Sequence, residues 1–294
     1  MTNNAESEPW AEERARLEDW RRCLREISPA HCPPLGLVCT CKDCIDPAKL
    51  KRIEGLPVAA ADHVLAGAYF GAAGAFKRDG SPVGGAGEAR DYQDEARFFF
   101  VKLAEALIDS VMSDDDTSSV LRDIWFVEPG YWHERLLATG FLETLDDSQR
   151  EGLRRFFGDL CRIAHARQSA RLWDCLEHMA VFSDALPEFA NELRAQPVLG
   201  QIMFWGAIMR DNLHTPAGEA GTLSIDLRKK AQLMLPEDTA PLIEAFCNPV
   251  LGRCLRLAAL RLRGEKERDI ALRALTLWEN SVAEMQLPYT PRNR

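Results

Sequence analysis

Apolar residues recur at helical spacing along most of the chain, and no stretch alternates between apolar and polar positions as a strand would. In the first predicted helix, residues 9–27, four apolar residues recur at intervals of three and four: Leu17, Trp20, Leu24 and Ile27. This spacing places them on one face of an amphipathic helix. The pattern therefore predicts an all-α protein built from packed helical hairpins.

Turn and capping residues mark where two further helices begin. Asp46 offers a cap and Pro47 supplies the fixed φ of a first turn, so a short helix is predicted from there to about Gly55. Ser148 and Glu151 have the spacing of a capping box. They predict the start of a helix with these inward-facing side chains: Leu153, Phe156, Phe157, Leu160 and Ile163.

Periodicity and composition predict three more helices. Residues 59–76 are rich in alanine and glycine, which allows a neighbouring helix to approach closely, and residues 78–89 are the best loop candidate. A helix over residues 93–112 is expected to place four apolar side chains on one face: Phe100, Leu103, Leu107 and Val111. The last predicted helix covers residues 265–286.

A short repeat occurs in the C-terminal half. The sequence Pro-Val-Leu-Gly occupies residues 197–200 and again 249–252, and each copy opens a predicted helix. One interpretation is HEAT-like stacking, in which each hairpin buries its apolar face on the next; chance identity of four residues is the other.

The whole pattern divides the chain into three regions that form one continuous body. An N-terminal helix and cysteine-rich connector occupy residues 1–58, a helical subdomain residues 59–170, and a helical-hairpin subdomain residues 171–294.

Composition narrows the classes of function. The 294 residues are 46% apolar and 28% charged, which is typical of globular proteins. A net charge of −9, from 36 basic and 45 acidic residues, argues against a nucleic-acid binder that relies on phosphate contacts. The N-terminus has no secretory signal, and the longest near-apolar run, residues 197–209, is too short to span a bilayer. We therefore expect a cytoplasmic protein with no membrane partner.

Four of the nine cysteines fall in the connector after the first helix: Cys32, Cys39, Cys41 and Cys44. Structural zinc takes four cysteine or histidine ligands, so one hypothesis is a zinc site formed by these four thiolates, with His31 as a spare ligand. A redox pair of Cys41 and Cys44 is a second hypothesis. Reduced thiols in an irregular connector are a third, and the spacing alone does not decide among them.

The remaining cysteines in apolar helical patterns are expected to act as small core hydrophobes: Cys161, Cys175, Cys247 and Cys254.

Four features between residues 41 and 150 carry a resemblance. A Cys-x-x-Cys close to Asp-Pro, at residues 41–47, precedes a glycine-interrupted helix, an aromatic helix segment at residues 98–103 and a Leu-Asp-x-x-Gln-Arg helix start at residues 145–150. In this order of motifs the chain resembles uncharacterised bacterial helical proteins. The resemblance covers less than half of the chain; it implies a helical fold and a cysteine patch, and it brings no activity with it.

Other candidate chemistry is sparse. Asp174 and His178 share one helical face, but the two Glu-x-x-His motifs that a di-iron site requires are absent. The glycine-rich residues 84–89 lack the Lys-Ser/Thr of a phosphate-binding loop. The arginine-rich stretch of residues 253–273 is interpreted as a solvated helix face with leucine, isoleucine and alanine opposite; binding of nucleic acid or of another acidic partner is the alternative.

These patterns favour a non-enzymatic protein-interaction module that binds a protein partner, either an adaptor or an immunity protein that neutralises a toxin. The alternative is a metal- or thiol-dependent enzyme or sensor that uses the Cys32–Cys44 cluster.

Overall fold

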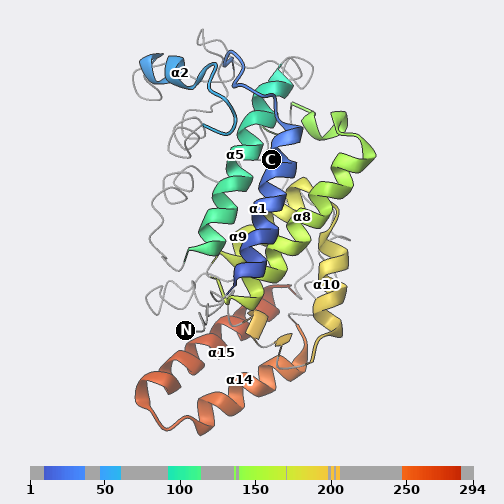
Figure 1. Cartoon of the computed structure of the whole chain (residues 1–294). Helices are drawn as coiled ribbons and strands as arrows, with labels where there is room; N and C mark the ends of the chain where they lie inside the picture. Colours follow the sequence, from blue (N-terminus) through green and yellow to red (C-terminus); the bar gives the residue numbers. More distant parts are fainter. Residues whose placement is uncertain are drawn as a thin grey trace, which may run out of the picture. The chain divides into compact units, whose positions relative to one another are not determined.

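The computed structural model describes residues 10–36, 47–60, 92–113, 136, 139–169, 171–197, 200–201, 203–205 and 247–285. These residues are mostly helical and contain no strand, which confirms the predicted all-α fold. In chain order the elements are α1 (Ala11–Ile27), α2 (Pro47–Ile53), α5 (Gln93–Met112), the 3-10 helix η2 (Phe141–Thr144), α8 (Asp147–Ala166), α9 (Leu172–Phe182), α10 (Leu186–Ala195), α14 (Pro249–Arg261) and α15 (Glu265–Met285) (Figure 1).

The chain divides into two compact units, Met1–Phe156 and Phe157–Arg294, and the boundary falls within α8.

Several predictions lie outside the described residues: the cap at Asp46, most of the helix over 59–76 and the loop over 78–89. The HEAT-like repeat is not confirmed. Its second copy opens α14 at Pro249 as predicted, whereas the first copy is described only in part.

Helix α5 forms the centre of the first unit. The predicted bounds, residues 93–112, are confirmed, and the four side chains predicted on one face are all buried; burial extends beyond that face to fifteen of the 20 residues. Four consecutive apolar residues, Phe98 to Val101, already face different directions around the helix. A helix that is apolar on all sides belongs inside a core, and neighbouring elements therefore pack around it.

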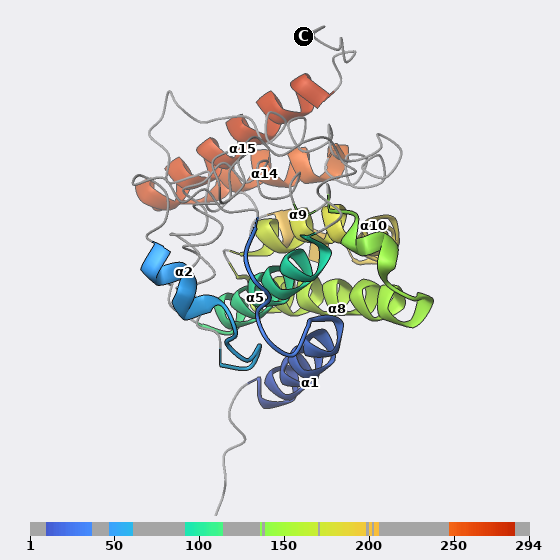
Figure 2. The same ribbon diagram turned by 90° about the horizontal axis from the view of Figure 1, so that it is seen from above.

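Helix α1 lies beside α5 (Figures 1 and 2). Its predicted stripe is confirmed, since Leu17, Leu24 and Ile27 are buried. Trp20 is half-buried and makes an edge contact with Phe156 of α8, with ring centroids 6.3 Å apart. The same stripe of α1 thus contacts two helices.

A ladder of charged side chains crosses the interface of α1 and α5. Arg21 of α1 pairs with Asp109 of α5. One turn further along α1, Arg25 Nε donates to Glu105 Oε1 at 2.6 Å. The other carboxylate oxygen of Glu105 accepts from Lys102 Nζ, also at 2.6 Å, and both of these side chains are only 1% exposed. Because rising numbers on α1 meet falling numbers on α5, the two helices run antiparallel.

The start of α8 corrects a sequence prediction. Asp146, and not Ser148, is the capping residue: Gln149 N–H donates to Asp146 Oδ1 at 2.8 Å, and Asp146 N–H donates to Gln149 Oε1 at 3.1 Å. This is the reciprocal pattern of a capping box, shifted two residues toward the N-terminus. An aspartate and a glutamine fill it in place of the expected serine and glutamate, so the helix begins at Asp147.

In the second unit, α14 and α15 form an antiparallel helical hairpin (Figures 1 and 2). A Cβ atom at Gly252 of α14 would lie 2.4 Å from the Trp278 ring of α15, so only glycine allows this approach. Arg256 Nη2 pairs with Glu279 Oε1 at 2.6 Å on the flank of the hairpin. These contacts fix the register of the two helices.

Candidate functional site

The cysteine connector after α1 is fastened to the chain that follows α2. Cys32 N–H donates to the Leu56 carbonyl at 2.8 Å, and Gly55 N–H donates to the Cys32 carbonyl at 2.9 Å. His31 and Pro57 form an isolated antiparallel bridge. Gly55 has φ +80°, a left-handed conformation that side chains disfavour, and it turns the chain back after α2. The end of α2 therefore sets the position of Cys32.

Two carboxylates hold the next turn of the connector. Leu35 N–H donates to Glu54 Oε1 at 3.0 Å, and Gly36 N–H donates to Glu95 Oε2 at 2.7 Å. A Cβ at Gly36 would lie 2.0 Å from the Tyr92 ring, which explains why glycine occupies this position. Hydrogen bonds to ionised groups are stronger than neutral ones. The connector is thus anchored immediately before it reaches Cys39.

The environment of Cys32 keeps its thiol protonated. Its side chain is buried, and Sγ–H donates to the Pro33 carbonyl at 3.5 Å. Burial, together with repulsion by Glu95 and Glu54, raises the pKa of Cys32 to about 12. The thiolate is the form that binds metal, so a metal ion at Cys32 would have to displace this proton in an environment that disfavours the anion.

The other three proposed ligands, Cys39, Cys41 and Cys44, lie outside the described residues. Within the described ranges, no group of three or more histidine, cysteine, aspartate or glutamate side chains is placed to hold a metal ion. The zinc site therefore stays a prediction, and so does the thiol-dependent alternative that uses the same cluster.

Native mass spectrometry of the purified chain, with and without a chelator, tests the zinc prediction. Four thiolate ligands predict one bound metal ion per chain, which the chelator removes. Replacing Cys39, Cys41 and Cys44 together with serine should abolish the added mass. Spectra in which the untreated protein already has the mass of the bare, reduced chain would contradict the prediction.

The structure separates the other described thiols by burial. Cys161 and Cys175 are fully buried, and burial raises the pKa of both, which confirms them as core residues. Cys247 and Cys254 are only half-buried, so the prediction of a core position is wrong for these two. Cys23 is exposed on α1. None of these five forms a disulfide.

This difference in burial predicts an order of thiol reactivity. Among the thiols that the structure describes, iodoacetamide under native conditions should modify Cys23 first, and should leave Cys32, Cys161 and Cys175 unmodified until the protein unfolds, because a buried thiol is both inaccessible and protonated. Peptide mass mapping over time measures the order. Modification of Cys161 as fast as Cys23 would show that the second unit opens readily.

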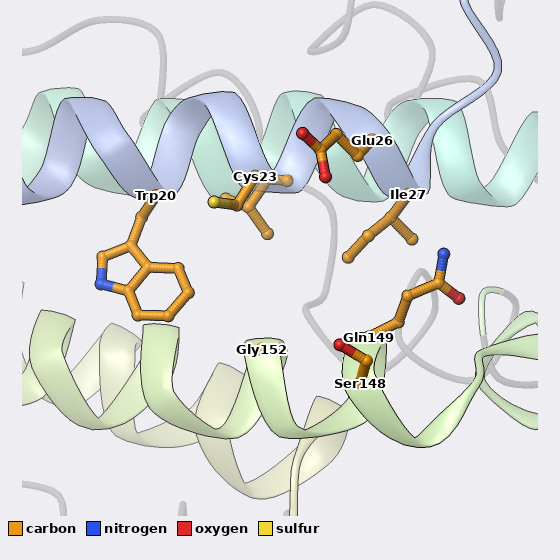
Figure 3. A pocket seen from close by; sticks show the side chains of 8 residues that line it. Trp20, Cys23, Glu26, Ile27, Ser148, Gln149 and Gly152 are labelled. Atoms are coloured by element: carbon orange, nitrogen blue, oxygen red, sulfur yellow. The ribbon is translucent and has the colours of Figure 1, made fainter.

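A pocket of about 220 Å³ lies between α1 and α8 in the first unit (Figure 3). Trp20, Cys23 and Glu26 of α1 face Ser148 and Gln149 at the start of α8. Sites for small molecules commonly measure roughly 300–1,000 Å³ and place several polar groups around one point. This pocket is smaller, and its polar groups do not converge, so we assign no chemistry to it.

A face that combines leucine and arginine side chains lies on the C-terminal hairpin. Six large apolar side chains are exposed in the described part of the chain, and four of them lie on this hairpin: Leu257, Leu260, Leu262 and Leu272. Leu260 is 81% exposed. Six arginines of the same hairpin are also exposed: Arg253, Arg256, Arg261, Arg263, Arg268 and Arg273. We call these ten residues the leucine–arginine face.

This face corrects the sequence interpretation of residues 253–273. Leucines were expected opposite the arginines, on the buried side. The predicted burial of the alanines is confirmed at Ala259 and Ala271, but four leucines of the stretch, Leu257, Leu260, Leu262 and Leu272, are exposed on the same hairpin as the arginines. The intermixed order of leucine and arginine between Leu255 and Arg263 is the signal in the sequence, because it leaves no clean separation of polar and apolar faces.

No protein-family model, curated protein or solved structure matches this chain. Its function must therefore be argued from its own residues.

The histidines other than His31 do not assemble a catalytic group among the described residues. His178 is fully buried in α9, and its ring contacts Phe182 edge-on, with centroids 6.2 Å apart. Asp174, its predicted neighbour, pairs with Arg171 at 3.6 Å. His165 contacts Phe204, and burial lowers its pKa. His133 and His214 lie outside the described residues.

None of the helices that the structure describes is long and apolar enough to cross a bilayer.

Proposed function

We propose that this chain is a non-enzymatic protein-interaction module, of the adaptor or toxin-neutralising immunity type. The observation that carries the proposal is the leucine–arginine face on α14 and α15. Isolated exposed leucines are ordinary on protein surfaces, but a cluster rimmed by polar groups marks a site of association.

The composition of this face fits a protein interface. Interface centres are apolar and enriched in arginine, which adds directional hydrogen bonds around the apolar contacts. Leu257, Leu260 and Leu272 supply the apolar centre, and the surrounding arginines supply the polar rim. The hairpin beneath is held by the close contact of Gly252 with Trp278 and by the pair of Arg256 with Glu279. A rigid support of this kind lowers the entropy lost on binding.

Site-specific cross-linking in the cells that produce the protein tests the proposal. A photo-reactive amino acid replaces Leu260 in one variant and Asn191, an exposed residue of α10, in the matched control. We expect one protein species to be cross-linked from position 260 and not from position 191. That species, identified and purified, should bind the chain directly in calorimetry, and Leu260→Glu should weaken the complex by at least about tenfold.

Two results would contradict the proposal. Equal cross-linking from positions 260 and 191 would show that the leucine–arginine face has no preferred partner. A cross-linked species whose affinity for the purified chain is unchanged by Leu260→Glu would show that the face is not the contact surface.

A further inference from the structure

We infer that the leucine–arginine face binds an acidic amphipathic helix of a partner protein. The inference rests on the proposed function and specifies the chemistry of the partner at the same surface. It follows from three features of the hairpin: where its exposed leucines lie, the local charge, and the ion pairs already present among its arginines.

The exposed leucines of both helices lie on one flank of the hairpin. The pair of Arg256 with Glu279 places the sides of α14 and α15 that carry these residues next to each other. Leu260 follows Arg256 by one turn, so it points only about 40° away from it around α14. Leu272 precedes Glu279 by two turns and points within about 20° of it around α15. Leu260 and Leu272 therefore face the same side.

The register places these two leucines at the same level. α14 ends at Arg261 and α15 begins at Glu265 and packs back on it, so residue numbers that increase along α14 lie beside numbers that decrease along α15. Eight residues beyond Gly252, Leu260 lies near the level of residues 270–275, which include Leu272. With Leu257 one turn away on α14, the leucines form an apolar strip that crosses both helices. An amphipathic helix offers a matching strip, from side chains at intervals of three, four and seven residues.

The local charge selects an acidic partner. Between Arg253 and Arg273 there are seven basic and three acidic residues, a local net charge of +4, whereas the whole chain carries −9. The rest of the surface therefore repels an acidic segment, and this stretch attracts it. Arginine suits this role because its planar guanidinium can bind a carboxylate through two parallel hydrogen bonds.

Ion pairs within the face favour a protein helix over an anionic membrane. Arg273 pairs with Asp269 and Arg256 pairs with Glu279, so carboxylates stand on the same exposed surface. Helices that lie in anionic membranes carry an excess of lysine and arginine on the polar face, where added carboxylates oppose binding to lipid headgroups. A partner helix can instead place its own charges between these fixed pairs.

Fluorescence anisotropy with a defined peptide panel tests the inference on the full chain. The probe is a labelled peptide of about 20 residues with leucines at helical spacing and glutamates beside them. One control peptide has the same composition in scrambled order, and a second has lysine in place of every glutamate. We expect the probe to bind at least about tenfold more tightly than either control, and more weakly as salt is added.

Matched variants locate the binding surface. Leu260→Glu and the double variant Arg261→Glu/Arg268→Glu should each weaken binding of the probe by about tenfold or more. Arg52→Glu, which changes an exposed arginine of α2, should leave binding unchanged. Circular dichroism confirms that each variant keeps its helical content, which is expected because the changed side chains are exposed.

Three outcomes would overturn the inference: equal binding of the probe and its scrambled control, insensitivity to Leu260→Glu, or tighter association with vesicles of phosphatidylserine than with the probe. The cellular cross-linking separates this failure from failure of the proposed function. A specific partner at position 260, combined with no preference for the acidic helix, leaves the interaction module intact and removes only the acidic-helix partner.

Discussion

Replacing Glu105 with glutamine will lower the free energy of unfolding by about 3–5 kcal/mol. Glu105 is 1% exposed and its two oxygens accept from Arg25 and Lys102, both at 2.6 Å. Glutamine has nearly the same shape but no charge. The Lys102 ammonium, itself 1% exposed, would then stay in the core without its carboxylate, and removal of one partner from a buried pair carries a large desolvation penalty. Chemical denaturation followed by circular dichroism measures the change.

Two further variants separate charge from packing in this experiment. Glu151→Gln in α8 makes the same substitution at an exposed carboxylate that pairs with Arg154 and Arg155, and we expect a change within the error of the measurement. Lys102→Met combined with Glu105→Gln removes both buried charges, and should recover most of the stability lost by Glu105→Gln alone. If Glu105→Gln has as little effect as Glu151→Gln, the charge of Glu105 does not stabilise the packing of α1 on α5.

Replacing glycine with alanine will change the free energy of unfolding in opposite directions at two helical positions. Gly152 in α8 has no atom within 4 Å of the position that a Cβ would take, so Gly152→Ala should raise the free energy of unfolding by about 0.5–1 kcal/mol through lower backbone entropy of the unfolded chain. Gly252 in α14 has the Trp278 ring at 2.4 Å from that position. Gly252→Ala should therefore lower the free energy of unfolding by about 1–3 kcal/mol, since the overpacking outweighs the gain in helix propensity.

The double variant Gly252→Ala/Trp278→Leu identifies the cause of the loss at Gly252. With a smaller side chain at position 278, the added methyl group has room, so Gly252→Ala should cost less in this background than in the native chain. Denaturation of the four proteins of this cycle gives the coupling between the two positions. An equal cost in both backgrounds would show that the hairpin does not rely on the close approach of α14 to Trp278.

Local sequence signals predicted the helix bounds well, because helix formation and helix ends depend mainly on residues that are neighbours in the chain. The bounds of α5 agree with the predicted residues 93–112, and α15 begins at Glu265 as predicted. The capping box of α8 was misplaced because Asp146 and Gln149 have the same spacing as Ser148 and Glu151, and both pairs can cap. Only the backbone conformation around residue 146 distinguishes them.

The candidate sites depended more strongly on tertiary contacts. The anchoring of Gly36 by Glu95 joins residues that are 59 positions apart, and no local pattern predicts that pairing. The raised pKa of Cys32, about 12, likewise follows from tertiary contacts: burial contributes most, and the negative charges of Glu95 and Glu54 add to it. A cysteine motif in the sequence specifies the thiols, but their protonation is decided by the groups that surround them.

The sequence by itself determined that this protein is helical, because the period of its apolar residues depends only on the geometry of one helix. It also determined that residues 253–273 carry a surplus of arginine. Only the tertiary structure decided which side of that stretch is buried. Gly252 admits the Trp278 ring, and three alanines of the hairpin are buried together with Leu251 and Leu277, whereas Leu257, Leu260 and Leu272 stay in solvent. Hydrophobicity alone favours burial of leucine over alanine. At Ala259 and Ala271 the packing of two particular helices reversed that order, and it left the neighbouring leucines on the surface to which we assign the function.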